Sequence, residues 1–332
     1  MPKSMPRIVI PDDAPPVMAS SESYRNLLER VRVDYHDTLP GTEERLIERI
    51  AGAEIVINIR SSTHFSENVF RQSPNLRLLS LWGTGTDNVD LAAAVRHGVT
   101  VTNTPGVSAV AIAEHALALL LAVARRIPPL DSEVRQGCWP RGQASQMHGK
   151  TLGIIGLGAV GRQFGRLGAG IGMRVIAWTM HPDPALGFEL VSLDDLLRSS
   201  DVVSLHLRLS DQTRGFIGKR EFEKMKRSAI LINTARGAIV DEQAMLEALT
   251  ASRIAGAGLD VFEAEPLPPS HPITRLDNVV LTPHSAGITP EALEAGLRLS
   301  IENVWNFVEG RPTHVVVSGD GARQRAPRDP PL

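Results

Sequence analysis

Three glycines stand at G-x-G-x-x-G spacing near the middle of the chain, at Gly156, Gly158 and Gly161. An apolar run precedes them and helix-compatible sequence follows, a context in which this spacing is typical of a dinucleotide-binding turn. Gly156 permits the tight turn, Gly158 lets the backbone approach a pyrophosphate, and Gly161 lets helix and strand pack closely. The start of the helix that follows, at Ala159 and Val160, offers N–H groups and the positive end of the helix dipole to the phosphates. The alternative is a Gly-rich turn of an α/β protein without such a ligand.

Three polar clusters follow apolar runs in the second half of the chain. They are INTARG with Arg236, LDVFEAEP with Asp260 and Glu265, and LTPHSAG with His284. Because the carboxyl ends of parallel strands face the ligand crevice of an open α/β sheet, these side chains are expected at that edge. Each also has a plainer interpretation: a surface arginine, a buried aspartate that accepts structural N–H groups rather than a cofactor amide, an exposed loop acid, and a structural histidine.

The three clusters together make one chemical unit. Hydride transfer to a 2-keto acid needs a cation for the carboxylate, a proton donor for the carbonyl oxygen, and a nicotinamide. The Arg236 guanidinium suits the carboxylate, because it forms two parallel hydrogen bonds. His284 is the expected proton donor, and the general base in the reverse direction. Glu265 is expected to bond the other imidazole nitrogen, which fixes the tautomer and favours the imidazolium.

Alternating strands and helices are expected to position these residues. In the first part of the chain, strands are predicted over 7–11, 31–35, 54–59, 76–81 and 99–103, and helices over 43–51, 67–71 and 91–97. In the second part, strands are predicted over 152–156, 174–178, 202–207, 229–233, 256–261 and 279–282, and helices over 160–170, 194–198, 219–225 and 241–251. The fold class is therefore α/β, with two doubly wound parallel sheets.

Two long helices are predicted on either side of the second set. Residues 108–126 are apolar nearly all round, which favours burial at an interface. The helix over 290–307 begins with Pro290 after Thr289, a suitable N-cap, and a β-branched run over 313–317 follows it.

This order of segments predicts that one domain is inserted into the other. The dinucleotide-binding domain is expected over 104–286, inside a first domain made of 1–103 and 287–318. Ligand is expected in the cleft between the domains. Residues 319–332 are rich in Pro, Arg and Asp and are predicted to be a disordered tail.

Composition narrows the class of protein. The 332 residues suggest two domains of roughly 150 residues each. A formal net charge of −2 gives no reason to expect nucleic acid or an anionic membrane as partner. Cys138 is the single cysteine, expected to be a buried or half-buried thiol, and no Cys/His metal spacing occurs. The N-terminal sequence lacks the apolar region of a signal peptide, so a cytoplasmic protein is expected.

The motifs TLGIIGLGAVG, INTARGAIVDE, GLDVFEAEPLP and LTPHSAG, in this order, resemble the signatures of the D-isomer-specific 2-hydroxyacid dehydrogenase family. The resemblance extends to about Val317 and so covers nearly the whole chain. It implies a flavodoxin-like substrate domain that is split by an inserted Rossmann domain. The catalytic Arg, Glu and His of the family correspond to Arg236, Glu265 and His284.

The resemblance also implies binding residues. IRSSTH places Arg60 near the substrate, and WGTGTDNVD resembles a loop whose N–H groups bind the substrate carboxylate at Gly83 and Thr84. The AEH motif at 113–115 matches the start of the helix between the domains. The implied cofactor-binding residues are Thr104, Gly156, Gly158, Ala159, Val160, Gly161, Thr179, His206, Thr213, Thr234, Ala235, Asp260 and Gly287.

Two positions depart from the family's pattern. An acid normally ends the second Rossmann strand, where it bonds the ribose 2′-OH and repels a 2′-phosphate. Thr179 stands there instead, and no arginine occurs between Val175 and Leu197, so NAD is expected and NADP stays an alternative. Arg208 stands where the family usually has the proline of H-x-P, and both the rim of an adenine pocket and a solvated position are open to it.

We therefore expect an oxidoreductase that reduces a small 2-keto acid, of the glyoxylate, hydroxypyruvate or pyruvate type, to the D-2-hydroxy acid with NAD(P)H. The alternatives are a phosphoglycerate or phosphite dehydrogenase variant and an NAD-sensing, corepressor-like binding protein. No metal, nucleic acid or membrane partner is expected. The family is commonly dimeric through the apolar helix and the Trp139 segment, so a homodimer is expected.

Overall fold

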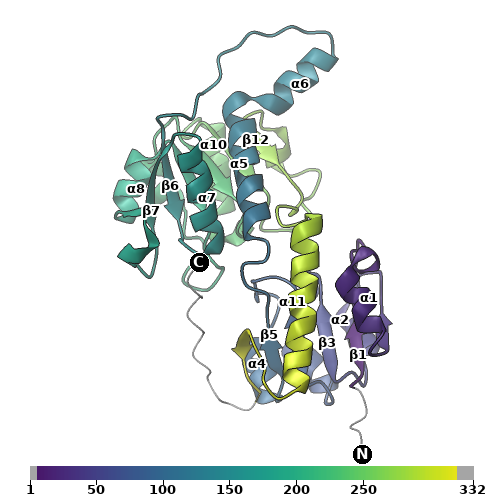
Figure 1. Cartoon of the computed structure of the whole chain (residues 1–332). Helices are drawn as coiled ribbons and strands as arrows, with labels where there is room; N and C mark the ends of the chain where they lie inside the picture. Colours follow the sequence, from purple (N-terminus) through teal and green to yellow (C-terminus); the bar gives the residue numbers. More distant parts are fainter. Residues whose placement is uncertain (1–5, 320–332) are drawn as a thin grey trace, which may run out of the picture. The chain divides into compact units, whose positions relative to one another are not determined.

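The computed structural model describes residues 6–319, which fold as two compact units (Figure 1). Unit 1 comprises residues 6–108 and 289–319, and unit 2 comprises residues 109–288. The predicted domain boundaries, after 103 and after 286, lie within a few residues of these limits. The predicted tail falls outside the described residues from 320 onward.

Unit 1 is built on a six-stranded sheet in the order β13-β5-β4-β3-β1-β2. Pairing is parallel from β2 to β5, and β13 is antiparallel at the edge beside β5. The five parallel strands have the flavodoxin-like order 2-1-3-4-5. The strands are Ile8–Ile10 (β1), Val33–Tyr35 (β2), Ile55–Asn58 (β3), Leu78–Leu81 (β4), Thr100–Thr102 (β5) and Val315–Val317 (β13).

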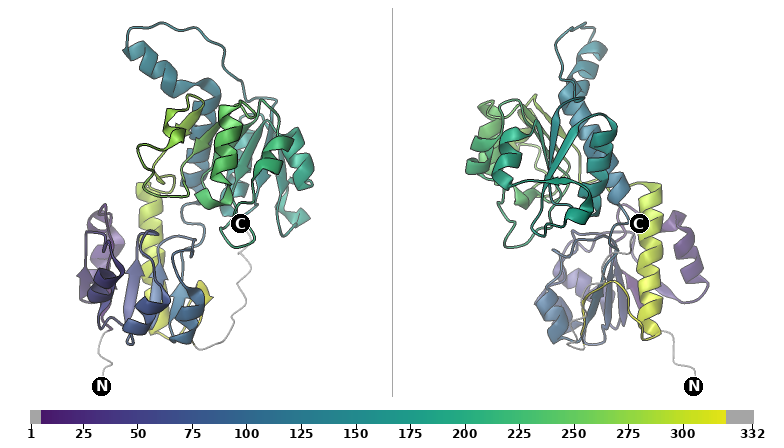
Figure 2. Two further views of the ribbon diagram at one scale, coloured as in Figure 1. Left: turned by 180° about the vertical axis from the view of Figure 1, so that it is seen from behind. Right: turned by 60° about the vertical axis from the view of Figure 1, so that its left-hand side comes forward.

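Helices cover both faces of this sheet (Figures 1 and 2). On one face, Leu27, Leu297 and Val304 join a core with the strands, and on the other Leu46 and Phe70 do so. The first face carries the 3-10 turn Met18–Ser20 (η1), α1 (Glu22–Leu28) and α11 (Pro290–Val308), and the second carries α2 (Glu43–Ile50), α3 (Glu67–Gln72) and α4 (Leu91–Arg96).

The long helix α11 begins as its sequence predicts. The Thr289 hydroxyl accepts the N–H of Ala292 at 3.2 Å, and Pro290 occupies the first turn, where its missing N–H costs nothing. Leu297, Ile301 and Val304, on one face of α11, are buried.

Unit 2 is built on a seven-stranded parallel sheet in the order β12-β11-β10-β9-β6-β7-β8. The chain order reverses between β6 and β9, which makes the carboxyl end of β6 the expected ligand position. The strands are Thr151–Ile155 (β6), Arg174–Trp178 (β7), Glu189–Leu190 (β8), Val202–Leu205 (β9), Ile230–Asn233 (β10), Gly256–Leu259 (β11) and Val279–Leu281 (β12). Six strands were predicted, and the two-residue β8 adds the seventh.

Helices again cover both faces. Figure 1 shows α5 (Ala109–Arg125) and α7 (Ala159–Gly170) side by side, and they share a core with β6 and β10. The core on the other face includes Leu196, Phe222 and Leu249. Its helices are α8 (Leu193–Ser199), α9 (Lys219–Lys224) and α10 (Glu242–Thr250), and the 3-10 turns of the unit are Pro184–Leu186 (η2), Gly237–Ile239 (η3) and Pro272–Arg275 (η4).

Helix α6 (Ile127–Arg135) differs from the other helices of unit 2, because it buries none of its residues. It projects from the sheet of its own unit (Figures 1 and 2). Cys138 follows it and is exposed, so the expectation of a buried or half-buried thiol is wrong. The apolar helix predicted before it is α5, which buries one side against α7 and β11, whereas Val110 is 54% exposed.

Two absences concern the part of the chain that the structure describes. None of its helices is both long and apolar enough to cross a membrane. None of its His, Cys, Asp and Glu residues form a group of three or more that is placed to hold a metal ion.

Candidate active site

The G-x-G-x-x-G turn joins β6 to α7 at the point where the strand order reverses. Gly156 has a φ of +101°, and a Cβ there would lie 2.7 Å from the backbone carbonyl oxygen of His206. A Cβ on Gly161 would lie 2.0 Å from the carbonyl oxygen of Gly156. Both positions therefore require glycine, the first for conformation and approach and the second for helix packing.

Gly158 is different, because the space beside it is open. Apart from Gly158 itself and its neighbours in the chain, no described atom lies within 4 Å of the position that its Cβ would take. It is the N-cap of α7, and no side-chain hydrogen bond caps the helix. The N–H groups of the first turn of a helix lack intrahelical acceptors, so this end offers donors and a positive dipole. The open turn fits the pyrophosphate of a dinucleotide.

A buried hydroxyl without a partner lies after β10. Thr234 is 8% exposed, and among the described residues its Oγ1 has no hydrogen-bond partner. The next N–H, of Ala235, donates to the side chain of Asn233 at 3.0 Å, whose amide donates to the carbonyl of Arg236 at 3.0 Å. Buried hydroxyls are normally satisfied, so a polar group of a bound cofactor fits this place.

Two residues predicted on the adenosine side follow β7 and β9. Thr179 comes directly after β7 and is half-buried. The His206 ring lies 5.5 Å from the ring of Phe164, and its Nε2 lies 2.9 Å from Ser204 Oγ. Burial lowers the pKa of His206 to about 3, so this histidine is neutral and adds no cation to the site.

The loop that follows β9 is closed by Thr213. Its buried hydroxyl donates to the carbonyl of Arg208 at 2.6 Å and accepts the N–H of Ser210 at 2.8 Å. The Arg208 residue itself is exposed. Thr213 thus shapes the loop, and its predicted contact with the cofactor stays a prediction.

His284 and Glu265 form a close pair. His284 Nδ1 lies 2.7 Å from Glu265 Oε2, and Glu265 Oε1 accepts the N–H of Phe262 at 2.9 Å. Burial raises the pKa of the Glu265 carboxyl, but the bonds from His284 and Phe262, with the charges of His284 and Arg236, hold it below its ordinary value. Glu265 is therefore an anion at neutral pH and an acceptor for a protonated Nδ1.

The loop that carries His284 is organised by Asp260. The Asp260 side chain is 1% exposed and accepts the N–H groups of Ser285 and Ala286, both at 2.9 Å. The Thr282 hydroxyl donates to it at 2.6 Å, and the predicted Gly287 follows these residues. Of the two roles that the sequence left open for Asp260, the structure shows the bonds to structural N–H groups, and its contact with the cofactor stays a prediction.

Arg236 lies close to this pair because a glycine follows it. A Cβ on Gly237 would lie 2.0 Å from the backbone carbon of Phe262, so only glycine lets the two loops meet here. The Arg236 Nη1 donates to the carbonyl of Ala235 at 2.7 Å, and its charge contributes to the low pKa of Glu265. The structure thus brings together the three residues of the predicted catalytic unit.

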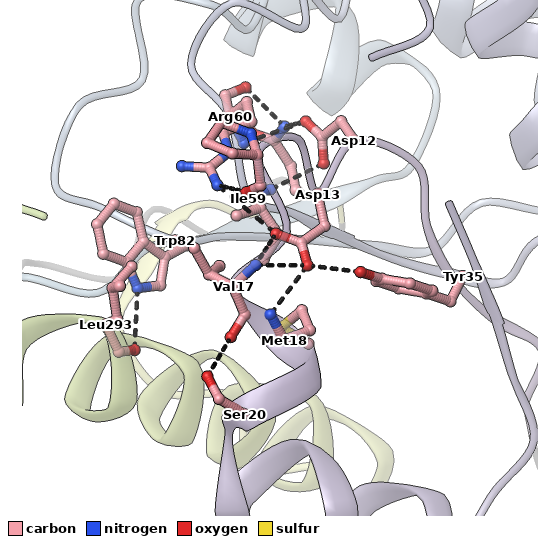
Figure 3. A network of polar contacts seen from close by, with 12 residues as sticks. Asp12, Asp13, Val17, Met18, Ser20, Tyr35, Ile59, Arg60, Trp82 and Leu293 are labelled. Atoms are coloured by element: carbon pink, nitrogen blue, oxygen red, sulfur yellow. Dashed lines mark hydrogen bonds and ion pairs between the residues drawn. The ribbon is translucent and has the colours of Figure 1, made fainter. Parts of the chain in front are cut away.

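Arg60 belongs to unit 1, where it follows β3 and is held by two buried acids (Figure 3). Asp12 accepts the N–H of Arg60 at 3.1 Å, and Asp13 Oδ1 lies 3.6 Å from Arg60 Nη2, which also donates to the carbonyl of Pro15. Tyr35 donates its hydroxyl to Asp13 at 2.8 Å. Burial lowers the pKa of Arg60, which Asp13 and Asp12 oppose.

Sequence reasoning missed Asp12 and Asp13, both of which have no exposed surface. Their signal is two consecutive acids directly after an apolar strand. Charged residues are rarely buried without partners, so such a pair indicates donors from neighbouring loops.

Gly83 and Thr84, predicted in the first domain, lie in unit 1 together with Thr104, which the predicted boundary after 103 assigned to the dinucleotide-binding domain. The Gly83 N–H donates to the Thr104 hydroxyl at 2.7 Å, and the Thr104 N–H donates to the Gly83 carbonyl at 2.9 Å. The Thr84 carbonyl accepts the side-chain amide of Asn103 at 2.9 Å. The Gly83 N–H is therefore engaged within the protein, which makes Thr84 the better candidate for an amide that binds substrate.

The chain is similar to known proteins over most of its length. Residues 117–286 match the family model for the NAD-binding domain of D-isomer specific 2-hydroxyacid dehydrogenases. Over 303 residues, 88% of this chain and 91% of the relative, the chain is 38% identical to a glyoxylate reductase of Korarchaeum cryptofilum. The chain belongs to the D-isomer specific 2-hydroxyacid dehydrogenase family. Its members are NAD(P)-dependent oxidoreductases that act on CH–OH groups, so the predicted family, enzyme class and cofactor class are confirmed.

Two further relatives carry other names, and one of them is much longer than this chain. A D-3-phosphoglycerate dehydrogenase of Archaeoglobus fulgidus is 40% identical over 284 residues, 83% of this chain, and the chain spans 54% of that relative's length. An acyclic imino acid reductase, solved in complex with NADPH and D-Arg, has a TM-score of 0.85 and 30% identity, and the match covers 93% of this chain and all of that one. The predicted α/β fold with two doubly wound sheets is confirmed.

Proposed function

We propose that this dehydrogenase reduces a small 2-keto acid, of the glyoxylate, hydroxypyruvate or pyruvate type, to the D-2-hydroxy acid, with His284 as the proton donor. The observation that carries the proposal is the 2.7 Å contact between His284 Nδ1 and Glu265 Oε2. A carboxylate only accepts, so Nδ1 carries a proton and Nε2 is the nitrogen left for the substrate. The protonated ring gives its Nε2 proton to the carbonyl oxygen, and the neutral ring takes it back in the reverse direction.

Glu265 and Arg236 support this step in different ways. The Phe262 N–H anchors Glu265, and the carboxylate stabilises the imidazolium before it transfers its proton. We assign Arg236 to the substrate carboxylate, because a guanidinium binds a carboxylate through two parallel hydrogen bonds. In unit 1, we assign Arg60 and the Thr84 N–H to substrate binding as well, and Gly83 supports Thr84 through its bonds to Thr104.

The cofactor residues are proposed from fit. The turn at Gly156, Gly158 and Gly161, with the N-terminus of α7 at Ala159 and Val160, would hold the pyrophosphate. Bound NAD(P)H supplies the hydride. We propose NAD as the cofactor, because no arginine that could pair with a 2′-phosphate occurs between Val175 and Leu197; NADP is the alternative, because Thr179 carries no charge that would repel this phosphate. Further contacts are proposed for Thr104, Thr179, His206, Thr213, Thr234, Ala235, Asp260 and Gly287.

Two finer statements complete the proposal. A homodimer is proposed through the region from α5 to the Trp139 segment, in which the exposed fractions of Val110, Ile127, Val134 and Trp139 are 54%, 55%, 47% and 76%. Exposed apolar side chains that lie close together in sequence suit a protein interface. A sedimentation mass of one chain would contradict the dimer. A cytoplasmic location stays a prediction.

A panel of keto acids tests the proposal. Glyoxylate, hydroxypyruvate, pyruvate and phosphohydroxypyruvate are each offered with NADH and with NADPH, and cofactor oxidation is followed. We expect turnover of at least one of the three unphosphorylated acids and a higher kcat/KM with NADH. Turnover of phosphohydroxypyruvate alone would favour the phosphoglycerate dehydrogenase alternative. Cofactor binding without any turnover would favour a binding protein over an enzyme.

A further inference from the structure

Helix α5 lies along β11 in a regular register. A Cβ on Gly256 would lie 3.0 Å from Val123 Cγ1, and a Cβ on Gly258 would lie 2.9 Å from Leu119 Cβ. Four helix residues rise about 6 Å and two strand residues rise about 6.6 Å, so the two repeats match along this contact. The two glycines of the strand let the helix approach its backbone this closely.

The next contact between α5 and the end of β11, four helix residues and two strand residues further on, is polar. It brings His115 of α5 to Asp260, which directly follows β11, with 3.6 Å between Nε2 and Oδ1. Thr282, which follows β12, bonds both side chains. Its Oγ1 lies 2.9 Å from His115 Nε2 and 2.6 Å from Asp260 Oδ1. A helix that otherwise packs apolar side chains on this strand thus ends the contact with a histidine on a buried carboxylate.

The chemistry of this trio fixes the directions of its hydrogen bonds. Asp260 receives donors at both of its oxygens and acts as an acceptor, so the Thr282 hydroxyl gives its single proton to Asp260. Thr282 Oγ1 can then only accept from His115, whose Nε2 carries a proton. The hydrogen bonds therefore run in one direction, from His115 to Thr282 and from Thr282 to the Asp260 carboxylate.

Asp260 also accepts hydrogen bonds from the loop that carries His284. Its two oxygens accept the N–H groups of Ser285 and Ala286, and its backbone carbonyl accepts the N–H of His284 at 2.7 Å. His284 has a φ of +52°, in the left-handed region that residues other than glycine rarely adopt. Such a conformation persists only where the surroundings hold it.

We propose that His115 and Thr282 are positioning residues, which act through Asp260 to hold the His284 loop in its catalytic conformation. The proposal rests on the proposed role of His284 as proton donor. The bonds of His115 and Thr282 described above end on Asp260 and none is made to the His284 ring. Asp260 is one of many proposed contacts with the cofactor, so the loss of these bonds should lower kcat much more than it lowers the affinity for NADH.

Matched substitutions test this in the full-length enzyme. His115→Leu and Thr282→Val remove the polar groups at similar volume, whereas His115→Gln and Thr282→Ser keep a donor and a hydroxyl. The first two should lower kcat about 10- to 100-fold, with KM and NADH affinity changed by no more than about twofold, because a small misplacement of the acid affects mainly the chemical step. The second two should recover most of the loss, and Glu114→Gln, an exposed neighbour on α5, serves as the control.

Two results of these assays would overturn the proposal. One is His115→Leu or Thr282→Val with the kcat of the wild type. The other is His115→Gln or Thr282→Ser as impaired as its apolar counterpart, because the donors would then not be what matters.

Amide hydrogen exchange gives a test that needs no turnover. The N–H groups of Ser285 and Ala286 should exchange about tenfold faster in His115→Leu and Thr282→Val, while Glu114→Gln behaves as the wild type. Unchanged exchange in both variants would overturn the proposal. If the wild type reduces no 2-keto acid, the proposed function fails, and the exchange rates still decide whether the trio holds the loop.

Discussion

The two units share a device at the ends of their strands: a buried aspartate after one strand accepts N–H groups from the loop after a neighbouring strand. In unit 1, Asp12 follows β1 and accepts two N–H groups from the residues after β3, at 3.0 and 3.1 Å. In unit 2, Asp260 follows β11 and accepts two N–H groups from the residues after β12, both at 2.9 Å. Parallel strands end at the same edge, so a carboxylate at one strand end reaches the loop of the next. The device presents Arg60 in one unit and His284 in the other.

The difference lies in the side chain that each loop presents. Arg60 has a second acid beside it, Asp13, and a carbonyl that fixes its guanidinium, so its charge is permanent and compensated. His284 has one carboxylate partner, Glu265, and the two side chains are 34% and 35% exposed. A compensated, immobile cation suits binding, whereas a partly exposed imidazole beside a single anion suits proton transfer. One backbone device thus serves either task.

The largest expected effect follows from the task of His284. His284→Ala should lower kcat by about 10²–10⁴-fold, the usual contribution of a general acid, and leave NADH affinity intact. Steady-state kinetics and a fluorescence titration with NADH measure the two quantities. His97→Ala, which alters a surface histidine bonded to Glu67, is the control. Near-normal kcat in His284→Ala would show that another group donates the proton.

Removing either of the two aspartates should lower the stability of the folded protein. Asp12→Ala and Asp260→Ala each leave at least two N–H groups without an acceptor, at a cost of about 1–3 kcal/mol for each such group that is buried. Urea denaturation measures the loss of stability. The control is Asp131→Ala, an exposed acid that pairs with Arg135. The device would be unimportant to the fold if the two buried positions behaved like Asp131.

The sequence predicted those features for which a backbone conformation, a close approach or a helix cap allows only one or a few residue types. Gly156, Gly161 and the N-cap Thr289 were placed by such demands, and the structure shows the close approaches and the cap that they imply. Apolar runs predicted every strand except two. β13 was noted as a β-branched run over 313–317 and not as a strand, and the two residues of β8, Glu189 and Leu190, are too few to show a pattern.

Long-range pairing was not readable in the same way. Asp12 and Asp260 accept hydrogen bonds from residues far along the chain, and their partners depend on which strand ends become neighbours. Helix α6 was missed for another reason: Pro128 and Pro129 follow its first residue, and a Pro-Pro pair is typical of a loop, so the short apolar pattern of Ile127, Leu130 and Val134 was not recognised. The proximity of Arg236, Glu265 and His284 was predicted because strand ends collect polar residues, whereas the helix residue His115 has no such signal.

A smaller effect on the kinetic constants is expected at Arg236, whose proposed task differs from that of His284. Arg236→Lys keeps the charge and loses the two parallel hydrogen bonds, so KM for the keto acid should rise about tenfold with little change in kcat. Steady-state kinetics with a range of keto acid concentrations measures this. The exposed Arg298→Lys on α11, which should leave both constants unchanged, is the control. A loss confined to kcat would place Arg236 with the proton donor and not with substrate binding.

The smallest expected effect concerns the pH dependence of stability, where two buried or half-buried carboxylates should act with opposite sign. Burial raises the pKa of Asp12 above 3.8, and hydrogen bonds only partly offset it. The folded protein therefore holds this proton more tightly, and the stability it contributes is lost as pH rises through the folded pKa. Glu265 has a folded pKa below 4.5, so its contribution is present above that value and is lost as pH falls through the folded pKa.

The matched variants Asp12→Asn and Glu265→Gln remove one titration each, and urea denaturation between pH 3 and pH 7 measures the consequence. Relative to the wild type, Glu265→Gln should be least stable near neutrality, and the gap should close towards acid. Asp12→Asn should show its largest gap in acid, where the wild-type carboxyl is protonated, and a smaller gap near neutrality. Two gaps that change in the same direction would contradict the assignment, because one buried anion would then be stabilised where the structure indicates a penalty.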